Sequence, residues 1–298
     1  MNFSMLFIAP KLFRIQHTST IMSRQYSILC LNGGGFRGGI QIGALLEFAK
    51  TVGTSNFASV FTDGMYGVSI GAILVAGLAF GCTIDEIADF ARTHFSFHSI
   101  LDHPNLGSLV HFRETLGFDN GEKIHACLKQ IFQSKGLDLD TLTIGDASVP
   151  LNIVATDLSR TKLVLFGPHV GLWDAIRASF SLPFVFTPHT IRGRVFVDGS
   201  VLCKQTLKLV KPEHRTKAIG FFLVDNRPLT EVTPSEFVSA VMRCHATTDV
   251  LRIKSKYPQN VVLLHESTVG MLDPEPDVEY MLTKGAELYR LFLSESRL

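Results

Sequence analysis

Residues 26–38 read Tyr-Ser-Ile-Leu-Cys-Leu-Asn-Gly-Gly-Gly-Phe-Arg-Gly, an apolar run that passes directly into a glycine-rich loop. The run from 26 to 31 predicts a buried strand, and residues 40–52 have the apolar period of a helix. A strand, a loop and a helix in this order begin an α/β unit. The loop also supplies consecutive backbone N–H groups with no side chains to crowd them, an arrangement that suits an anion.

A second unit of the same kind follows, and it carries a candidate nucleophile. Residues 60–66 predict a second strand, and residues 67–71 read Gly-Val-Ser-Ile-Gly before an apolar helix. This is the G-x-S-x-G pattern of a sharp strand-to-helix turn that exposes a serine hydroxyl, here Ser69. Gly67 and Gly71 let the chain turn without a Cβ clash. A serine beside a loop rich in N–H donors favours acyl transfer.

Strand-like and helical segments alternate through the rest of the chain, without a repeat or a linker-like stretch. Further strands are expected at 151–156, 162–166, 194–197, 218–224 and 261–265, and helices at 70–80, 84–93, 122–134, 173–179, 234–256 and 277–293. The alternation predicts a three-layer αβα fold around a central, mostly parallel sheet. We expect residues 1–23 to be a disordered leader or to lie upstream of a later start, and residues 24–298 to form one domain.

The composition disfavours several classes of protein. Charged residues are 18% and hydrophobic residues 46%, which predicts a large core rather than disorder. The 28 basic and 27 acidic residues balance and form no basic tract, so no nucleic-acid partner is expected. The five cysteines are widely spaced and form neither a zinc pattern nor a disulfide framework, which fits a reducing compartment.

Three competing interpretations are weaker. The stretch between Asp63 and Asp85 has no charge and is long enough to cross a bilayer, but its glycines divide it, and a buried helix is preferred. Residues 33–38 fit G-x-G-x-x-G, but no acidic residue lies where a dinucleotide ribose would need it. The helically spaced His94, His98 and Asp102 lack the H-E-x-x-H pattern, so no metal is expected.

Ser69 also needs a base, and the sequence offers two. Asp198 follows the strand at 194–197, at a strand end of the kind where active sites collect. Its carboxylate can take the serine proton if exclusion of water raises its pKa toward neutrality. His265 ends another strand and would complete a Ser-His-Asp triad of the α/β-hydrolase type. The dyad, the triad and a non-catalytic lipid-binding relic all stay open at this point.

Five stretches together resemble the patatin-like phospholipase family. They occur in the family's order over about residues 26–200, at 33–38, 67–71, 155–158, 178–188 and 198–199. The resemblance implies a patatin-like fold and a catalytic dyad, with Ser69 as nucleophile and Asp198 as base. It also implies that the oxyanion is held in the glycine loop, chiefly by the N–H groups of Gly34 and Gly35; the loop comprises Gly33, Gly34, Gly35, Arg37 and Gly38.

The resemblance further implies hydrolysis of fatty-acyl esters in phospholipids or related lipids through an acyl-enzyme, with no metal or cofactor. The expected partner is a lipid substrate at a membrane surface, and the expected location is cytoplasmic with peripheral membrane association. Asn32 stands where many members have Asp, and Ser200, beside Gly199 of the acid motif, where Gly or Ala is common. Asn32 can still cap the loop, whereas Ser200 can compete for a hydrogen bond to Asp198. The apolar region 94–119 is expected to form an acyl wall or lid.

Overall fold

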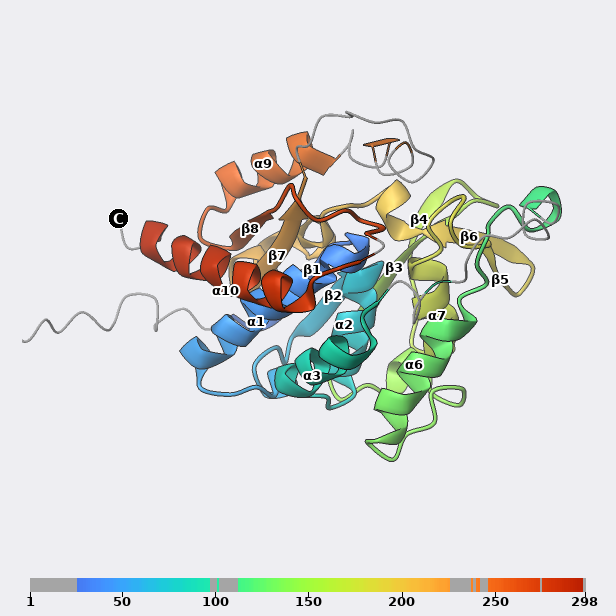
Figure 1. The fold of residues 1–298 in the computed structure, drawn as a ribbon, viewed down its shortest axis with the longest axis horizontal. Coiled ribbons are helices and arrows are strands. Elements are labelled where there is room, and N and C mark those ends of the chain that lie inside the picture. Colours follow the sequence, from blue (N-terminus) through green and yellow to red (C-terminus); the bar gives the residue numbers. More distant parts are fainter. Residues whose placement is uncertain are drawn as a thin grey trace, which may run out of the picture.

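The computed structural model describes residues 26–96, 101, 112–225, 237, 240–241, 246–273 and 275–296. Within these residues an eight-stranded sheet has the order β5-β6-β3-β2-β1-β7-β8, and β4 pairs with β3 (Figure 1). The strands are β1 (Ile28–Leu31), β2 (Gly64–Val68), β3 (Leu151–Asp157), β4 (Lys162–Leu165), β5 (His189–Ile191), β6 (Arg194–Asp198), β7 (Ala218–Val224) and β8 (Val261–His265). The block β3-β2-β1-β7-β8 is parallel, whereas β4, β5 and β6 are antiparallel to their neighbours.

Helices cover both faces of the sheet. They are α1 (Gly38–Val52), α2 (Ile70–Ala79), α3 (Ile84–His94), α6 (Glu122–Gln133), α7 (Leu172–Ser179), α9 (Ala246–Lys256) and α10 (Val278–Glu295). Side chains of β1 alternate between two cores, as strand geometry requires. Leu29 and Leu31 join the large core under α1, α2, α3, α6, α7 and α10, while Ile28 and Cys30 join a smaller one under α9. The predicted three-layer αβα fold is therefore confirmed.

Most predicted elements are found close to their expected bounds, but the second strand is displaced. It was expected at 60–66 and lies at Gly64–Val68. The chain before it forms a short 3₁₀ turn, Phe57–Ser59, in which the Ala58 N–H donates to the Asn56 side chain. Phe57 and Phe61 are fully buried against Phe48 of α1, so their hydrophobicity reflects helix packing rather than a strand.

The other expectations concern the leader, two helices, a membrane span and the number of domains. Thr83 and Glu86 form a capping box at the start of α3. The leader at 1–23 and most of the first half of the helix expected at 234–256 lie outside the described residues, while α9 covers the second half. Among the described residues, no helix combines the length and the apolar character needed to cross a bilayer. That residues 24–298 form one domain stays a prediction.

Candidate active site

Ser69 occupies the sharp turn between β2 and α2. Its φ is 58° and its ψ is −128°, a strained conformation that non-glycine residues rarely adopt. The flanking glycines allow the turn, because an added Cβ would lie 2.4 Å from the Gly71 oxygen at Gly67 and 2.7 Å from the Asn32 oxygen at Gly71. The Ser69 hydroxyl therefore stands at the N-terminus of α2, where the helix dipole favours negative charge.

The backbone of Ser69 is held by a serine that the sequence analysis did not single out. The Ser69 N–H donates to Ser179 Oγ at 2.9 Å, and the Ser179 hydroxyl donates to the Val154 carbonyl at 2.6 Å. Ser179 ends α7 and is fully buried. This relay ties the turn at Ser69 to β3 and fixes the direction in which the Ser69 side chain points.

The strand register brings Asp198 to the level of Ser69. Val68 of β2 is paired with Val154 of β3, and the next residue of β3, Ala155, is paired with Asp198 of β6. Ser69 and Asp198 therefore lie at one height on the two sides of β3. The chain after Asp198 packs directly against the end of β2, because a Cβ at Gly199 would lie 2.6 Å from Val68 Cγ2. The sheet thus carries these two distant parts of the sequence to one place.

The Asp198 carboxylate is buried and hydrogen-bonded. Its Oδ1 accepts hydrogen bonds from the N–H of Ser200, at 2.8 Å, and from the Ser200 hydroxyl. The Ser69 side chain lies close enough to the carboxylate to lower its pKa. Burial raises the pKa of Asp198, and the bonds from Ser200, the nearby Ser69 side chain and the charge of Lys204 oppose that rise only in part. A base with a raised pKa beside a serine hydroxyl is the arrangement that proton transfer requires.

The backbone around Asp198 is fixed as firmly as its side chain. The Asp198 N–H donates to the Ser181 carbonyl at 2.8 Å, and Thr156 Oγ1 donates to the Asp198 carbonyl at 3.0 Å. Ser181 is bound in turn by Arg177, a buried guanidinium whose pKa burial lowers to about 10. The stretch 178–188 therefore helps to position the carboxylate, through the bond from the Asp198 N–H to Ser181.

The glycine loop lies directly against Ser69. A Cβ at Gly33 would lie 2.8 Å from Ser69 Cβ and 3.5 Å from Ser69 Oγ. Gly35 has a φ of +59°, and the following N–H, of Phe36, donates to the Met271 carbonyl at 3.0 Å. Within the described part of the chain, the N–H groups of Gly33, Gly34 and Gly35 have no acceptor. They are thus the loop donors left for a bound anion.

Two polar side chains fix the ends of this loop. Asn32 pairs with the backbone of Leu223 in β7, accepting from its N–H at 2.8 Å and donating to its carbonyl at 3.0 Å. Arg37 donates through Nε to the Gly34 carbonyl at 3.3 Å and forms a buried ion pair with Asp225 at 2.9 Å. The sequence analysis missed Asp225. Its position directly after the apolar run 218–224 was the available signal, because the carboxyl ends of parallel strands share one edge of a sheet.

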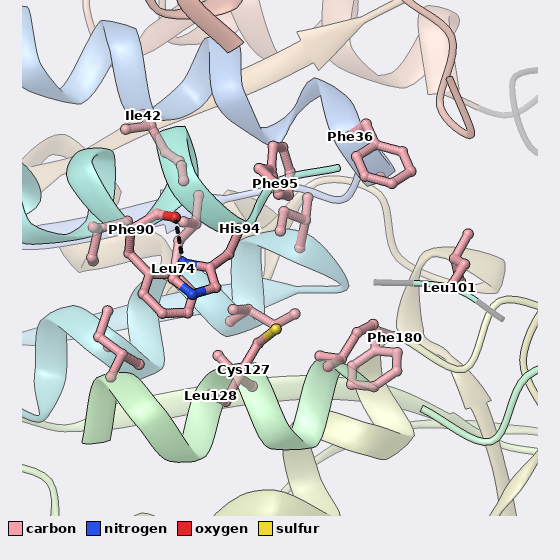
Figure 2. Close-up of a pocket in the computed structure, with 18 of the residues that line it drawn as sticks. Phe36, Ile42, Leu74, Phe90, His94, Phe95, Leu101, Cys127, Leu128 and Phe180 are labelled. Carbon is pink, nitrogen blue, oxygen red and sulfur yellow. Dashed lines mark hydrogen bonds between the residues drawn. The ribbon is translucent and has the colours of Figure 1, made fainter. Parts of the chain in front are cut away.

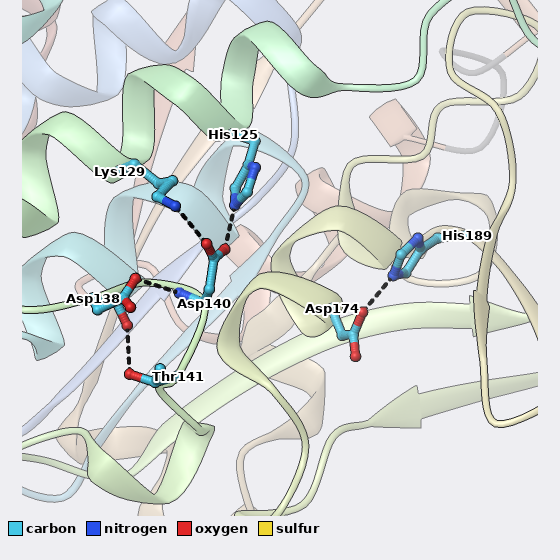
Figure 3. Close-up of polar contacts among 7 residues, drawn as sticks. All are labelled: His125, Lys129, Asp138, Asp140, Thr141, Asp174 and His189. Atoms are coloured by element: carbon cyan, nitrogen blue, oxygen red, sulfur yellow. Dashed lines mark hydrogen bonds and ion pairs between the residues drawn. The ribbon is translucent and has the colours of Figure 1, made fainter.

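Two of the described histidines have acidic partners, and neither pair includes Ser69 or Asp198. Figure 3 shows His125 bound to Asp140, at 2.6 Å, and His189 bound to Asp174, at 2.8 Å. His265 is exposed at the end of β8, three places from β2 in the sheet, which is about 14 Å at the usual strand spacing. The described residues contain no group of three or more His, Cys, Asp or Glu side chains that could hold a metal. His98 and Asp102 lie outside those residues.

An apolar cavity of about 150 Å³ begins beside the glycine loop and Ile70, the residue after Ser69. Figure 2 shows Phe90 and His94 from α3, and Cys127 and Leu128 from α6, around this space. His94, Phe95 and Leu101 also line it, so part of the region 94–119 forms its wall; residues 97–100 and 102–111 lie outside the described residues.

Comparisons with known proteins give a consistent result. A family model described as "Patatin-like phospholipase" matches residues 29–230. Uncharacterized protein R571 of Acanthamoeba polyphaga mimivirus is 29% identical over 187 residues, which are 60% of this chain and 59% of that protein. A cGAMP-activated phospholipase of Vibrio cholerae serotype O1 is 38% identical over 199 residues, 61% of this chain and 55% of that one. This chain thus spans less than two thirds of the length of either relative.

A solved structure shares the fold. VipD from Legionella pneumophila superimposes with a TM-score of 0.55 at 15% sequence identity, over 91% of this chain and 67% of VipD. At this identity the likeness concerns the fold alone. It agrees with the three layers and the mixed sheet described above.

Proposed function

Because the chain belongs to the patatin-like phospholipase family, we propose that it is a lipid acyl hydrolase that works through a Ser69–Asp198 dyad. The observation that carries the proposal is the meeting of these two side chains across β3, with Gly33 against Ser69. The proposed substrates are fatty-acyl esters of phospholipids or related lipids at a membrane surface. The apolar cavity beside Ile70 offers the acyl chain a place out of water.

The proposed reaction has two halves. Asp198 takes the proton of the Ser69 hydroxyl as its oxygen attacks the acyl carbonyl, and the resulting oxyanion is held by the N–H groups of Gly34 and Gly35. The protonated Asp198 then gives its proton to the departing alkoxide, which leaves an ester on Ser69. Water attacks that ester while Asp198 accepts its proton, and the fatty acid leaves as Ser69 regains a proton.

Two hydrogen-bonding serines support this scheme without reacting. Ser179 holds the Ser69 backbone, and Ser200 binds Oδ1 of Asp198. The bonds from Ser200 to Oδ1 leave the second carboxylate oxygen to receive a proton. Ser200 therefore orients the base, while burial keeps the pKa of Asp198 above that of an exposed aspartate.

Gly35→Ala tests the glycine loop. An alanine there would be forced to a φ of +59°, with its Cβ 2.1 Å from the Met271 carbonyl oxygen, so the loop and its donors must move. Loss of one aligned oxyanion donor lowers kcat by roughly 10²- to 10³-fold. We expect that loss in p-nitrophenyl ester hydrolysis. Gly53→Ala is the matched control, since Gly53 has a φ of +74°, no atom within 4 Å of its Cβ, and no contact with the site. Equal activity of the two variants would contradict an oxyanion role.

His265→Ala separates the dyad from a triad. The histidine is exposed and lies three strands from β2, so its removal is expected to leave kcat and KM within about twofold of the parent values. The measurement is steady-state hydrolysis of a short-chain ester and of a phospholipid in vesicles. A collapse of activity in the folded variant would favour a Ser-His-Asp triad and overturn the dyad.

A further inference from the structure

We propose that the apolar cavity receives one acyl chain and that its far end, at Gly77, sets the length of chain accepted. The inference rests on the proposed function, because it assumes that the bond to be cleaved lies at Ser69. It goes further by identifying the residue that selects among acyl substrates. Five features of the cavity lead to it.

Three helices, of which α3 and α6 are amphipathic and α2 is apolar throughout, turn apolar stripes toward the same space. The stripes have helical spacing and comprise Ile70, Ile73, Leu74 and Gly77 of α2, Ile87, Phe90, Ala91 and His94 of α3 with Phe95 directly after it, and Ile124, Cys127, Leu128, Ile131 and Phe132 of α6. Such stripes ordinarily interlock at the density of a crystal. Here the three stripes leave a cavity between them, so residues of all three helices determine the shape of that cavity.

Contacts at the two ends give the cavity a direction. Near Ser69, Phe95 packs on Phe36 of the glycine loop with ring centroids 5.2 Å apart, and a Cβ at Gly121, the residue before α6, would lie 3.2 Å from Phe180. At the other end Phe132 packs against Phe80, which follows α2, at 5.6 Å. The α2 stripe therefore leads from Ile70, the residue after Ser69, to a far end formed around Gly77, Ile87 and Phe132.

The length of this path predicts a chain length. Ile70 and Gly77 are seven residues apart on α2, which corresponds to about 10 Å along the helix axis. With C–C bonds of about 1.5 Å in a zigzag, an extended alkyl chain of roughly eight carbons spans that distance. Medium-length acyl chains are therefore expected to fill the cavity, and longer ones to bend or leave part of the chain outside it.

Gly77 is the position where a side chain would shorten the cavity. A Cβ there would lie 3.4 Å from Ile87 Cδ1, an ordinary contact that an alanine satisfies. The further carbons of a leucine have to enter the cavity, because Ile87 and Cys82 already occupy the nearest space around the Cβ.

The lining selects for hydrocarbon rather than for a head group. Its polar side chains are His94 and Cys127. His94 stacks on Phe90 at 4.1 Å, and its Nδ1 is already engaged by Thr93 Oγ1 and the Phe90 carbonyl. Burial raises the pKa of the Cys127 thiol, so it stays neutral. Neither group is suited to bind a phosphate, and the apolar end of the substrate is the part that fits.

The test compares chain-length profiles. The ratio of kcat/KM for p-nitrophenyl octanoate to that for the butyrate is measured in the parent and in Gly77→Leu. We expect Gly77→Leu to lower this ratio by at least about tenfold, because several methylene groups lose their place. Gly167→Leu is the control, since a Cβ there meets no atom within 4 Å and Gly167 lies outside the cavity lining. It should leave the ratio unchanged. Phe132→Ala, which enlarges the far end, should shift the preference toward longer chains.

A binding measurement separates failure of this inference from failure of the proposed function. Octanoate is titrated calorimetrically into Ser69→Ala and into the Ser69→Ala, Gly77→Leu double variant. Binding that the second substitution weakens tenfold or more supports the inference even if the parent hydrolyses no ester. An unchanged octanoate-to-butyrate ratio, or equal octanoate binding by the two proteins, would identify the cavity as a packing void and overturn the proposal.

Discussion

Ser69→Ala is expected to lower hydrolysis of phospholipids and of p-nitrophenyl esters by about 10⁴-fold or more, as loss of a nucleophile does in serine hydrolases. The reason is chemical rather than structural. The Ser69 backbone is held by its N–H bond to Ser179, which alanine keeps, and only the hydroxyl beside Asp198 disappears. The measurement is turnover of both substrates by protein whose thermal unfolding matches that of the parent.

Ser294→Ala is a matched control for that result. Its hydroxyl lies on the exposed face of α10 and donates to the Leu291 carbonyl, so activity should not change. Substantial turnover by folded Ser69→Ala protein, comparable to that of the control, would rule out Ser69 as the nucleophile.

Asp198→Asn is expected to lower kcat by roughly 10³- to 10⁴-fold, because an amide cannot accept the serine proton. The parent's kcat/KM should also show an acid limb, since the base acts only when ionised. Burial raises the pKa of Asp198, so the limb should lie above the usual aspartate range near 4. The pH profile of short-chain ester hydrolysis measures both effects. Normal activity of folded Asp198→Asn protein would overturn the dyad.

The same substitution has a predictable effect on stability. A carboxyl whose pKa is raised by folding contributes stability below its unfolded pKa, and this contribution is lost as the pH rises through the folded value. At neutral pH the folded protein therefore carries an unfavourably buried charge, which asparagine removes. Thermal unfolding of Asp198→Asn should accordingly occur at a higher temperature than that of the parent at pH 7.5, with a smaller difference at pH 4. A lower unfolding temperature at pH 7.5 would contradict this account of the carboxylate.

The parts of the site that could be predicted are those encoded locally. The turn at Ser69 and the glycine loop are each specified by a few adjacent residues, and the run 218–224 is apolar throughout because both faces of this strand are buried. The contacts that Ser179 and Asp225 make are not encoded in their neighbouring residues. Each acts on a residue far from it in the sequence, through a pairing that exists only once the sheet has formed.

The cavity was hidden for a related reason. The stripes of α3 and α6 have the spacing of ordinary core helices, and nothing in one helix shows that three of them fail to interlock. The displaced second strand is a similar case, because Phe57 and Phe61 are apolar in order to pack on Phe48 rather than to extend β2. The spacing of apolar residues indicates that a segment is buried, but the packing between segments decides which neighbour it contacts.

The central claim is that Ser69 carries the acyl group during turnover. The direct measurement is brief reaction with a p-nitrophenyl ester, an acid quench, and peptide mapping by mass spectrometry. An acyl adduct on Ser69 in the parent, and its absence in Asp198→Asn, is the predicted result. An adduct on another residue, or equal acylation of Ser69 without Asp198, would contradict the account.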